Sequence, residues 1–557
     1  MKRLILGMCL ATFTFLSAAA APGSGFLKGK ILRIDRENIA ERGGSSMELS
    51  LTGGLNTSSS LSLLDVERAL QKAASDEDIA MVYINYDHLS VSQAAAEEIR
   101  SLLLEVSRSG KPVVAYGASL DNASYYLVSG ADRIFLHPKG GGPLTGMAST
   151  QFFLKDLLDT LGVQVQLIRH GKYKSAGEMY IRNDISPENR RQYEELLTNI
   201  WDSRVDEMAL SRGIEVDSLE HWVNHLSLGT AHTWVEKGLV DGLKYRDEME
   251  QYLCHLFGTK DSDEVKRIGI KDYIGKLKKG PARTKVAVLY ADGEIVREGG
   301  GVAGERLAKE IARVRADSTV KAVVFRVNSP GGEVVAADII RREIELLGQV
   351  KPVIASYGAY AASGGYLISA GCRRIFTDHA TLTGSIGVFG MVPSLGGAIR
   401  KVLKVNPVSI ETDEHSAMAS GMDPLTPEEE AWYQEEIEDI YDDFVAVVAR
   451  GRHMTEGQVD EIAQGRVWCG VDALENGLAD QRGTLMDAIH YAAKEAHLGS
   501  SYRIVSYPEK QSFMKELMGK EDKNDKNPLV RSLQEPGFHA IVRMPYITLD
   551  PLNPISL

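Results

Sequence analysis

Cysteine is scarce in this chain, and positive charge is in deficit. The 557 residues include four cysteines, none close to another, which excludes a CxxC zinc knuckle and a disulfide-dense scaffold. Lysine and arginine number 63 against 76 aspartates and glutamates, a formal net charge of −13. Nucleic-acid binders carry basic patches, so this balance argues against a nucleic-acid partner. The cysteines are Cys9, Cys254, Cys372 and Cys469.

Long apolar runs are also rare, and the one present stands at the N-terminus. Met1-Lys2-Arg3 precedes the apolar stretch Leu4–Ala21, which ends in small residues. A basic start, an apolar middle and an Ala-rich end predict an export signal. A run of about 18 residues is also long enough to remain as a membrane anchor. We therefore expect residues 1–22 to be a signal sequence or an anchor, with the bulk of the chain in the periplasm, beside a bacterial inner membrane.

The chain repeats itself at a period of about 240 residues, as expected of a tandem duplication. A chain of 557 residues is too long for one ordinary core. We expect a first repeat over residues 23–280, a second over 281–508 and a C-terminal tail over 509–557, with the boundary in the basic linker 276–283. The matching pairs are residues 111–115 with 351–355, 186–188 with 426–428, and 238–241 with 477–480.

Each repeat alternates strand and helix patterns. In the second, strands are predicted at 285–290, 322–327 and 352–356, and helices at 306–315 and 334–347. Such alternation predicts an α/β fold with mostly parallel sheets and flanking helices. Ser186-Pro187-Glu188 and Thr426-Pro427-Glu428 have the pattern of helix N-termini. We expect the two long helices that they open to end near Gly213 and Gly451.

A serine in a glycine-rich turn is the main candidate for chemistry. Residues 360–366 read Tyr-Ala-Ala-Ser-Gly-Gly-Tyr, and small neighbours allow the tight turn that exposes a nucleophilic serine, here Ser363. Residues 328–332, Asn-Ser-Pro-Gly-Gly, follow one predicted strand and precede a helix. Backbone N–H groups near Gly332 and Gly364 could hold an oxyanion.

The first repeat lacks these parts but contains a candidate base. At an offset of 240 residues Ser363 falls on Ala123, and a one-residue slip would bring in Ser124 instead. Residues 170–176, His-Gly-Lys-Tyr-Lys-Ser-Ala, hold Lys172 and Lys174, whereas residues 408–430 of the second repeat contain no lysine or arginine. A lysine can act as a general base if burial lowers its pKa. A solvated surface lysine is the alternative.

Residues 328–332, 361–365 and 381–387 (Thr-Leu-Thr-Gly-Ser-Ile-Gly) together resemble the signal peptide peptidase A (protease IV) family, serine proteases of the Clp protease and crotonase-like superfamily. The resemblance covers roughly residues 28–505 and implies a tandem duplication of a Clp protease/crotonase-like unit. It implies a Ser-Lys dyad in which Lys174, in the Tyr-Lys-Ser-Ala motif, is the base for Ser363. It also implies membrane-bound degradation of cleaved signal peptides and other unfolded peptides, and a homotetramer, with no metal or other cofactor.

Other assignments remain open from the sequence. His379, expected on an exposed loop, and His415, near the position matching Lys174, are rival bases for a Ser-His-Asp triad. From its position in sequence, Ser385 is a candidate to orient the lysine amine. The competing functions are a crotonase-type acyl-CoA enzyme, which needs a backbone oxyanion hole but no serine nucleophile, and a catalytically inactive membrane-tethered scaffold.

Overall fold

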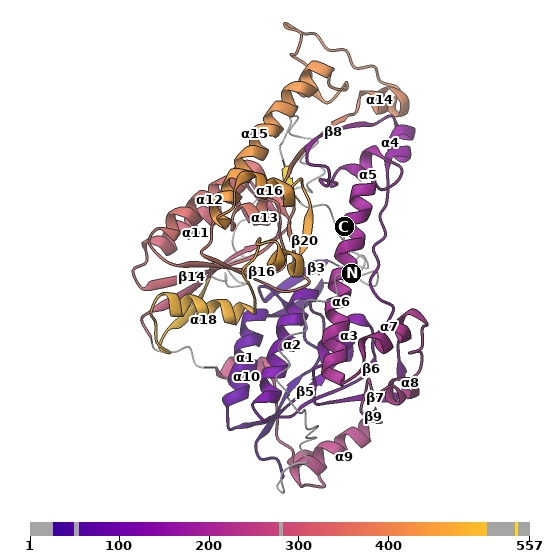
Figure 1. Ribbon diagram of the computed structural model, residues 1–557, viewed down its shortest axis with the longest axis vertical. Coiled ribbons are helices and arrows are strands. Elements are labelled where there is room, and N and C mark those ends of the chain that lie inside the picture. Colours follow the sequence, from indigo (N-terminus) through magenta and orange to yellow (C-terminus); the bar gives the residue numbers. More distant parts are fainter. Residues whose placement is uncertain (1–25, 50–54, 278–281, 509–540, 544–557) are drawn as a thin grey trace.

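The computed structural model describes residues 26–49, 55–277, 282–508 and 541–543. The expected signal sequence or anchor at residues 1–22 lies outside this part of the chain. Among the helices of the described residues, none combines the length and the apolar character needed to cross a bilayer. Figure 1 shows the first repeat around α1, α2 and β5 and the second repeat around β14 and β16.

The first repeat is built on a sheet whose six described strands are all parallel, in the order β10-β1-β5-β6-β7-β9. Its strands are β1 (Lys30–Ile34), β5 (Ile79–Asn85), β6 (Val113–Ser119), β7 (Arg133–Gly141), β9 (Gly242–Leu243) and β10 (Arg267–Gly269). Its helices are α1 (Leu63–Ser75), α2 (Gln93–Arg108), α3 (Asn122–Val128), α4 (Lys155–Leu161), α5 (Glu178–Ile181), α6 (Pro187–Arg212), α7 (Val216–Asn224), α8 (Ala231–Glu236), α9 (Arg246–Phe257) and α10 (Ile270–Lys276). A small separate sheet holds β2 (Ile39–Ala40), β3 (Gly44–Leu49) and β4 (Leu55–Ser62).

The second repeat has the same strand order, β22-β11-β14-β16-β17-β21, again parallel, with β18 and β20 added beside β16. Its strands are β11 (Lys285–Asp292), β14 (Val320–Ser329), β16 (Val353–Ala362), β17 (Arg374–Thr377), β18 (Leu382–Gly384), β20 (Val467–Cys469), β21 (Gln481–Arg482) and β22 (Arg503–Tyr507). Its helices are α11 (Gly304–Ala316), α12 (Val334–Gly348), α13 (Gly364–Leu367), α14 (Gly396–Ala398), α15 (Pro427–Arg452), α16 (Glu456–Ile462), α17 (Gly470–Glu475) and α18 (Leu485–Glu495). The expected α/β class and the duplication are confirmed.

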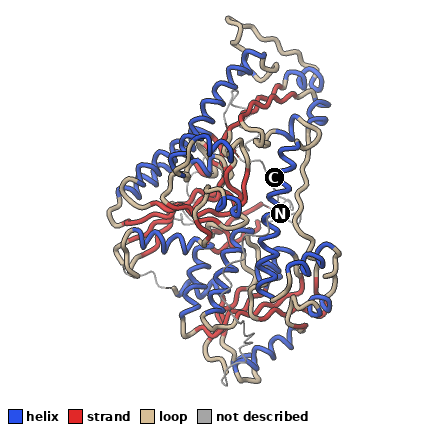
Figure 2. Tube along the Cα trace, in the orientation of Figure 1, coloured by secondary structure: helices blue, strands red, loops and turns tan. Residues whose placement is uncertain are grey.

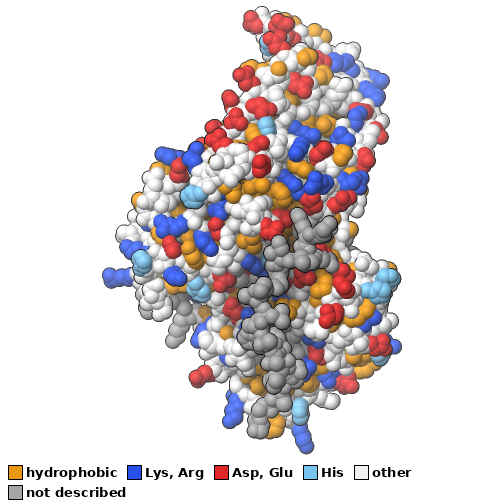
Figure 3. All heavy atoms as spheres, in the orientation of Figure 1, with side chains coloured by type: hydrophobic (Ala, Val, Ile, Leu, Met, Phe, Trp, Pro, Cys, Tyr) orange, Lys and Arg blue, Asp and Glu red, His pale blue; other side chains and the backbone are white. Residues whose placement is uncertain are grey.

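The local sequence explains most of these elements. β5 is almost continuously apolar, and so is the middle of β14 from Ala322 to Phe325, because helices cover both faces of a parallel sheet. The long helices α6 and α15 begin as predicted, with Ser186 or Thr426 accepting a backbone N–H and proline in the first turn. On the face shown in Figure 3, acidic side chains gather along α15. The two long helices thus share an N-terminal device and differ in surface charge.

The predicted end of α15 near Gly451 is confirmed to within one residue. The helix continues to Arg452, and His453 takes the left-handed conformation, with φ 56°, that ends it. Gly451 is itself helical and packs closely on the chain just after α13: a Cβ there would lie 2.3 Å from the Ala370 carbonyl oxygen. The glycine therefore permits a close approach, whereas Gly213 does cap α6, with φ 64°.

A third sheet joins the two repeats. Its order is β13-β12-β15-β23-β19-β8, and β8 comes from the first repeat. β8 pairs antiparallel with β19 from the second repeat over seven residue pairs, from Gln164↔Ser394 to His170↔Val388. Figure 2 shows these strands above the two large sheets, and in Figure 1 β8, α4 and α5 lie with α14 at the upper end. The strands of this sheet are β8 (Gln164–His170), β12 (Ile295–Val296), β13 (Val302–Ala303), β15 (Gly331–Glu333), β19 (Val388–Ser394) and β23 (Ile541–Arg543).

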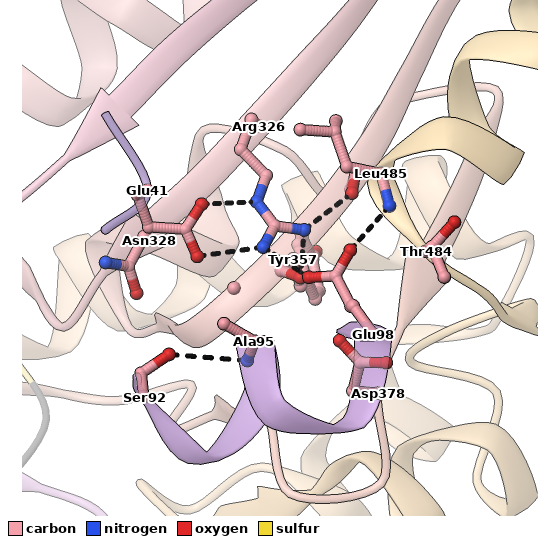
Figure 4. Close-up of polar contacts among 12 residues, drawn as sticks. Glu41, Ser92, Ala95, Glu98, Arg326, Asn328, Tyr357, Asp378, Thr484 and Leu485 are labelled. Carbon is pink, nitrogen blue, oxygen red and sulfur yellow. Dashed lines mark hydrogen bonds and ion pairs between the residues drawn. The ribbon is translucent and has the colours of Figure 1, made fainter. Parts of the chain in front are cut away.

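A buried ionic cluster also fastens the repeats together. The Arg326 guanidinium on β14 donates to both carboxylate oxygens of Glu41 at 2.8 Å and to Glu98 on α2 at 2.6 Å (Figure 4). The second carboxylate oxygen of Glu98 accepts the backbone N–H of Leu485, the first residue of α18, at 2.6 Å. Carboxylates are favoured at helix N-termini, where backbone N–H groups lack helical partners. The cluster therefore fixes the first repeat against a strand and a helix of the second.

Candidate active site

Ser363 lies where β16 ends and the short helix α13 begins. Its backbone is at φ 55° and ψ −118°, a conformation that non-glycine residues rarely adopt. Its N–H donates to the Gly384 carbonyl on β18 at 2.8 Å. Small residues around the turn are needed because a Cβ at Gly365 would lie 2.4 Å from the Ser329 carbonyl oxygen. The turn therefore holds the Ser363 hydroxyl in one place, within the protein interior.

Lys174 reaches the same place from the first repeat. After β8 ends at His170, the chain turns at Gly171, with φ 104°, and the Lys174 N–H donates back to the Gly171 carbonyl at 3.1 Å. The neighbouring N–H of Tyr173 donates to the Gln464 carbonyl of the second repeat at 2.9 Å. The pairing of β8 with β19 thus carries this turn into the second repeat.

The Lys174 amine lies within hydrogen-bond distance of three oxygens. Nζ is 2.8 Å from Ser363 Oγ, 3.0 Å from Ser385 Oγ and 3.1 Å from the Ser385 carbonyl oxygen. A neutral amine has two N–H donors and one lone pair. Two donors for the two Ser385 oxygens leave the lone pair free to accept the Ser363 hydroxyl proton. The arrangement matches a neutral lysine that faces a protonated serine.

Burial favours that neutral state. The Lys174 side chain is 0% exposed, and desolvation lowers its pKa well below the ordinary value of 10.5. Burial acts in this direction because a charged ammonium loses its hydration in a low-dielectric interior. The Phe389 ring on β19 lies 5.9 Å from Nζ and forms part of this apolar surrounding. Lys174 is therefore not the solvated surface lysine that was the alternative from the sequence.

Several groups that no sequence motif indicated contact Lys174 on the side away from Ser363. The Arg169 guanidinium donates to the Lys174 carbonyl at 2.6 Å and contacts the buried carboxylate of Glu178 at 3.3 Å. Gly465, with φ 74°, packs so closely on Lys174 that a Cβ would lie 2.6 Å from the lysine Cβ. Arg169, Glu178 and Gly465 belong to no recognised motif, and all three are distant from Ser363 in sequence. These contacts restrict where the amine can point.

The two glycines proposed for an oxyanion hole lie on elements that contact each other, β15 and α13. Gly332 on β15 has φ 156°, and a Cβ there would lie 1.9 Å from the Ile295 carbonyl oxygen. Gly364 is the first residue of α13, and N–H groups in a first helical turn have no partner within the helix. Both positions therefore present backbone close to the Ser363 turn.

The rival bases lie elsewhere. Lys172 is exposed, with its amine 5.5 Å above the Tyr173 ring. His415 is largely exposed and contacts Glu429 at 3.1 Å. The expectation of an exposed loop for His379 is wrong: its side chain is 21% exposed, lies 4.0 Å from Glu207, and burial lowers its pKa to about 4.

The matching region of the first repeat is closed by its own side chains. The Ser124 hydroxyl is taken up by the N-terminus of α3, where it donates to the Asp121 carboxylate at 2.6 Å. The Asp87 carboxylate accepts the N–H groups of Ala118 and Ser119 at the end of β6, at 2.7 and 2.9 Å. A carboxylate thus occupies the backbone donors that follow this strand, and no second nucleophilic turn is formed there.

Comparison with known proteins places the chain among proteases. The family model "Peptidase family S49" matches residues 105–258 and 345–499, one segment in each repeat. "Protease 4" of Haemophilus influenzae is 34% identical over 80% of this chain and 74% of its own length. "Serine protease SPPA, chloroplastic" of Arabidopsis thaliana is 33% identical over 82% of this chain and 70% of its own length. The "Putative signal peptide peptidase SppA" of Enterococcus faecium is 32% identical over 48% of this chain and 81% of its own length.

Each family segment lies within one of the two repeated α/β units, and the relatives that match 80% or more of the chain span parts of both. The chain therefore belongs to peptidase family S49, as a serine protease with two repeats.

Proposed function

We propose that Ser363 and Lys174 form the catalytic dyad of a serine endopeptidase. The observation that carries the proposal is the 2.8 Å separation between Lys174 Nζ and Ser363 Oγ in a buried site. Heavy-atom separations of about 2.6–3.2 Å allow a base to take a proton directly. Burial supplies the neutral amine that this step requires.

The reaction follows from these positions. Neutral Lys174 takes the proton of Ser363 as the serine oxygen attacks the peptide carbonyl, and Lys174 becomes an ammonium. The ammonium then gives that proton to the leaving amine, so an acyl-enzyme and a neutral Lys174 remain. Water then attacks the acyl-enzyme, with Lys174 again accepting a proton. The developing oxyanion is held by backbone N–H groups near Gly332 and Gly364. Ser385 keeps two donors of Lys174 engaged, so its lone pair points at Ser363.

For the substrate we propose signal peptides released from exported proteins, together with other unfolded peptides. Three observations support this: the N-terminal apolar run of residues 4–21, the similarity to a relative named as a signal peptide peptidase, and the similarity to "Protease 4". We further propose that the protein works at the inner membrane, facing the periplasm, as a homotetramer.

A fluorophosphonate probe tests the nucleophile. It should label the wild-type chain on Ser363, and labelling should vanish in Ser363→Ala. Ser124→Ala is the matched control, because that hydroxyl caps α3 in the first repeat. Labelling that survives in Ser363→Ala would refute the assignment, and a chain that never labels would support an inactive scaffold.

A second assay tests the substrate class. The purified chain is given three substrates: a synthetic signal peptide in detergent, a folded precursor protein that still carries this signal peptide, and an acyl-CoA thioester. We expect cleavage of the free peptide alone. Thioester turnover without peptide cleavage would favour the crotonase-type alternative.

A further inference from the structure

The carboxylate of Glu97, on α2 of the first repeat, holds a turn of the second repeat. One carboxylate oxygen accepts the backbone N–H of His379 at 2.9 Å, and the other accepts that of Ala380 at 3.1 Å. Both donors lie in the turn between β17 and β18, residues 378–381. The Glu97 side chain is buried, and the Arg204 guanidinium on α6 lies 3.9 Å from it. Hydrogen bonds to an ionised acceptor are stronger than neutral ones, so the first repeat fixes this turn firmly.

The turn 378–381 leads directly into a strand that contacts both members of the proposed dyad. β18 begins at the next residue and pairs in parallel with the end of β16, the strand that leads to Ser363. At the end of β18, the Gly384 carbonyl accepts the Ser363 N–H at 2.8 Å. The following residue, Ser385, presents its carbonyl and hydroxyl oxygens to Lys174 Nζ at 3.1 and 3.0 Å. The position of β18 therefore affects the nucleophile and the base together.

Contacts within the second repeat hold the same turn at other atoms. The Thr381 hydroxyl donates to the Gly358 carbonyl on β16 at 2.8 Å, and the His379 carbonyl accepts the Gly470 N–H at 3.0 Å. These contacts leave the N–H groups of His379 and Ala380 to Glu97. A buried N–H without an acceptor is unfavourable. Loss of the carboxylate should therefore displace the turn, and with it the start of β18.

We propose that Glu97 is a positioning residue of the peptidase: by holding the turn between β17 and β18, it sets where the end of β18 meets Ser363 and Lys174. This inference rests on the proposed peptidase function, because it concerns the geometry of the same dyad. Glu97 acts through the backbone of the turn and of β18, and takes no part in the proton transfers. The first repeat thus contributes to the site twice, once by the base itself and once by the carboxylate that fixes the surroundings of base and nucleophile.

The alternative is that Glu97 only fastens the two repeats together. Glu67 on α1 provides the comparison, because it is also a buried carboxylate of the first repeat that accepts a backbone N–H of the second, that of Met486 at 2.8 Å. Met486 lies at the start of α18, a helix that carries none of the residues of the candidate site. A role in fastening alone predicts similar effects for changes at Glu67 and Glu97. A positioning role predicts a loss of turnover at Glu97 only.

The first test measures kcat and KM of the full chain with a fluorogenic peptide. Glu97→Gln keeps the shape of the side chain but replaces one acceptor oxygen by an N–H₂ group. It should lower kcat about tenfold, because a small displacement of reacting groups slows the chemical step. KM should stay within about twofold, since the change affects the dyad and not peptide binding.

Two further variants separate the turn from the joint between the repeats. Thr381→Val disturbs the same turn from within the second repeat and should also lower kcat with little change in KM. Glu67→Gln disturbs the joint but not the turn, and is the matched control: its kcat should stay within about twofold of wild type even if its Tm falls. Wild-type kcat in either Glu97→Gln or Thr381→Val, or an equal loss of kcat in Glu67→Gln, would overturn the inference.

The second test observes Lys174 without catalysis, by NMR of the Ser363→Ala chain labelled with carbon-13 at the lysine Cε atoms. The signal that disappears on Lys174→Met belongs to that lysine. Glu97→Gln and Thr381→Val should move this signal, and Glu67→Gln should leave it in place. A signal that none of the three moves would overturn the inference, whereas the proposed function would still stand on the loss of labelling in Ser363→Ala. The expected movement, in a chain whose wild-type form neither hydrolyses peptides nor labels, would keep the positioning role and overturn the proposed function instead.

Discussion

The Lys174 amine lies 2.8 Å from the Ser363 hydroxyl oxygen, although 189 residues separate the two in sequence. The lysine comes from one repeat and the serine from the other. The contact depends on β8 of the first repeat pairing with β19 of the second, and on the buried ionic cluster that fixes the repeats together.

Removal of the Lys174 amine should abolish most of the peptidase activity. We expect Lys174→Met to lower kcat/KM by about 10²–10⁴-fold, the range that a positioned general base contributes. Lys172→Met is the matched control, because that exposed amine lies outside the buried site, and its activity should stay within about twofold of wild type. A similar loss in both variants would show that the two lysines act through a shared surface charge.

The same substitution should change how stability depends on pH. Burial lowers the pKa of Lys174 well below 10.5 in the folded state, so the unfolded chain binds the extra proton between those two pKa values. Wild-type stability should therefore rise with pH across this window, up to about 10.5. Lys174→Met removes this slope, so its advantage in Tm over wild type should shrink as pH rises. Parallel Tm profiles for the two chains would contradict the burial of a titrating amine.

Gly465→Ala should lower activity although it replaces no group that takes part in the reaction. The new Cβ would lie 2.6 Å from the Cβ of Lys174, at a position with φ 74°, so the lysine backbone must move. A displacement of this kind is expected to lower kcat by about 10²-fold. Gly457→Ala in α16 is the control, because open space surrounds that position. Full activity in Gly465→Ala, together with a normal urea-unfolding curve, would contradict this prediction.

Arg326→Met should destabilise the joint between the repeats. It leaves Glu41 and Glu98 buried without their cation, and the loss of one partner of a buried ion pair costs about 3–5 kcal/mol. Urea unfolding measures the effect. Arg313→Met, which removes the exposed pair with Glu310, should cost at most about 1 kcal/mol. Equal costs at the two positions would mean that the cluster contributes no more than a surface pair.

Glu97→Gln should flatten the stability profile at mildly acidic pH. Burial raises the pKa of the Glu97 carboxyl to about 7 in the folded chain, from an ordinary 4.5. The folded state then holds more protons than the unfolded state between these values, so wild-type stability should fall as pH rises from about 4.5 to 7. In Glu97→Gln this part of the decline should disappear, as measured by Tm at half-unit pH steps. Glu310→Gln on the surface should leave the decline unchanged.

Much of the fold was accessible from the sequence because its signals are local. Apolar runs gave the central strands, and Ser186 and Thr426 marked the starts of α6 and α15. The end of α15 was placed to within one residue, although Gly451 serves close packing and the left-handed residue that ends the helix is His453. A glycine alone does not show which of the two roles it has.

The site was less accessible, since its parts come from distant segments. Ser363 and Lys174 could be named from their motifs, and the comparison of the two repeats suggested that they belong together. Arg169, Glu178 and Gly465 could not be named from a motif. Arg169 reaches the Lys174 carbonyl and the Glu178 carboxylate only once the turn after β8 has folded, and Gly465 packs on Lys174 from the other repeat. The half-buried position of His379 was missed for a similar reason: Glu207, which it approaches, belongs to the other repeat.

The pairing of β8 from the first repeat with β19 from the second has a consequence for when activity can arise during biosynthesis. The ribosome makes the segment with Lys174 first and the segment with Ser363 later, and the two meet only when β8 finds β19. With the proposed dyad, a nascent or truncated chain would hold a base without a nucleophile, or a nucleophile without a base. Proteolysis would then begin only in a finished molecule, so the enzyme could not cleave itself or neighbouring chains during its synthesis.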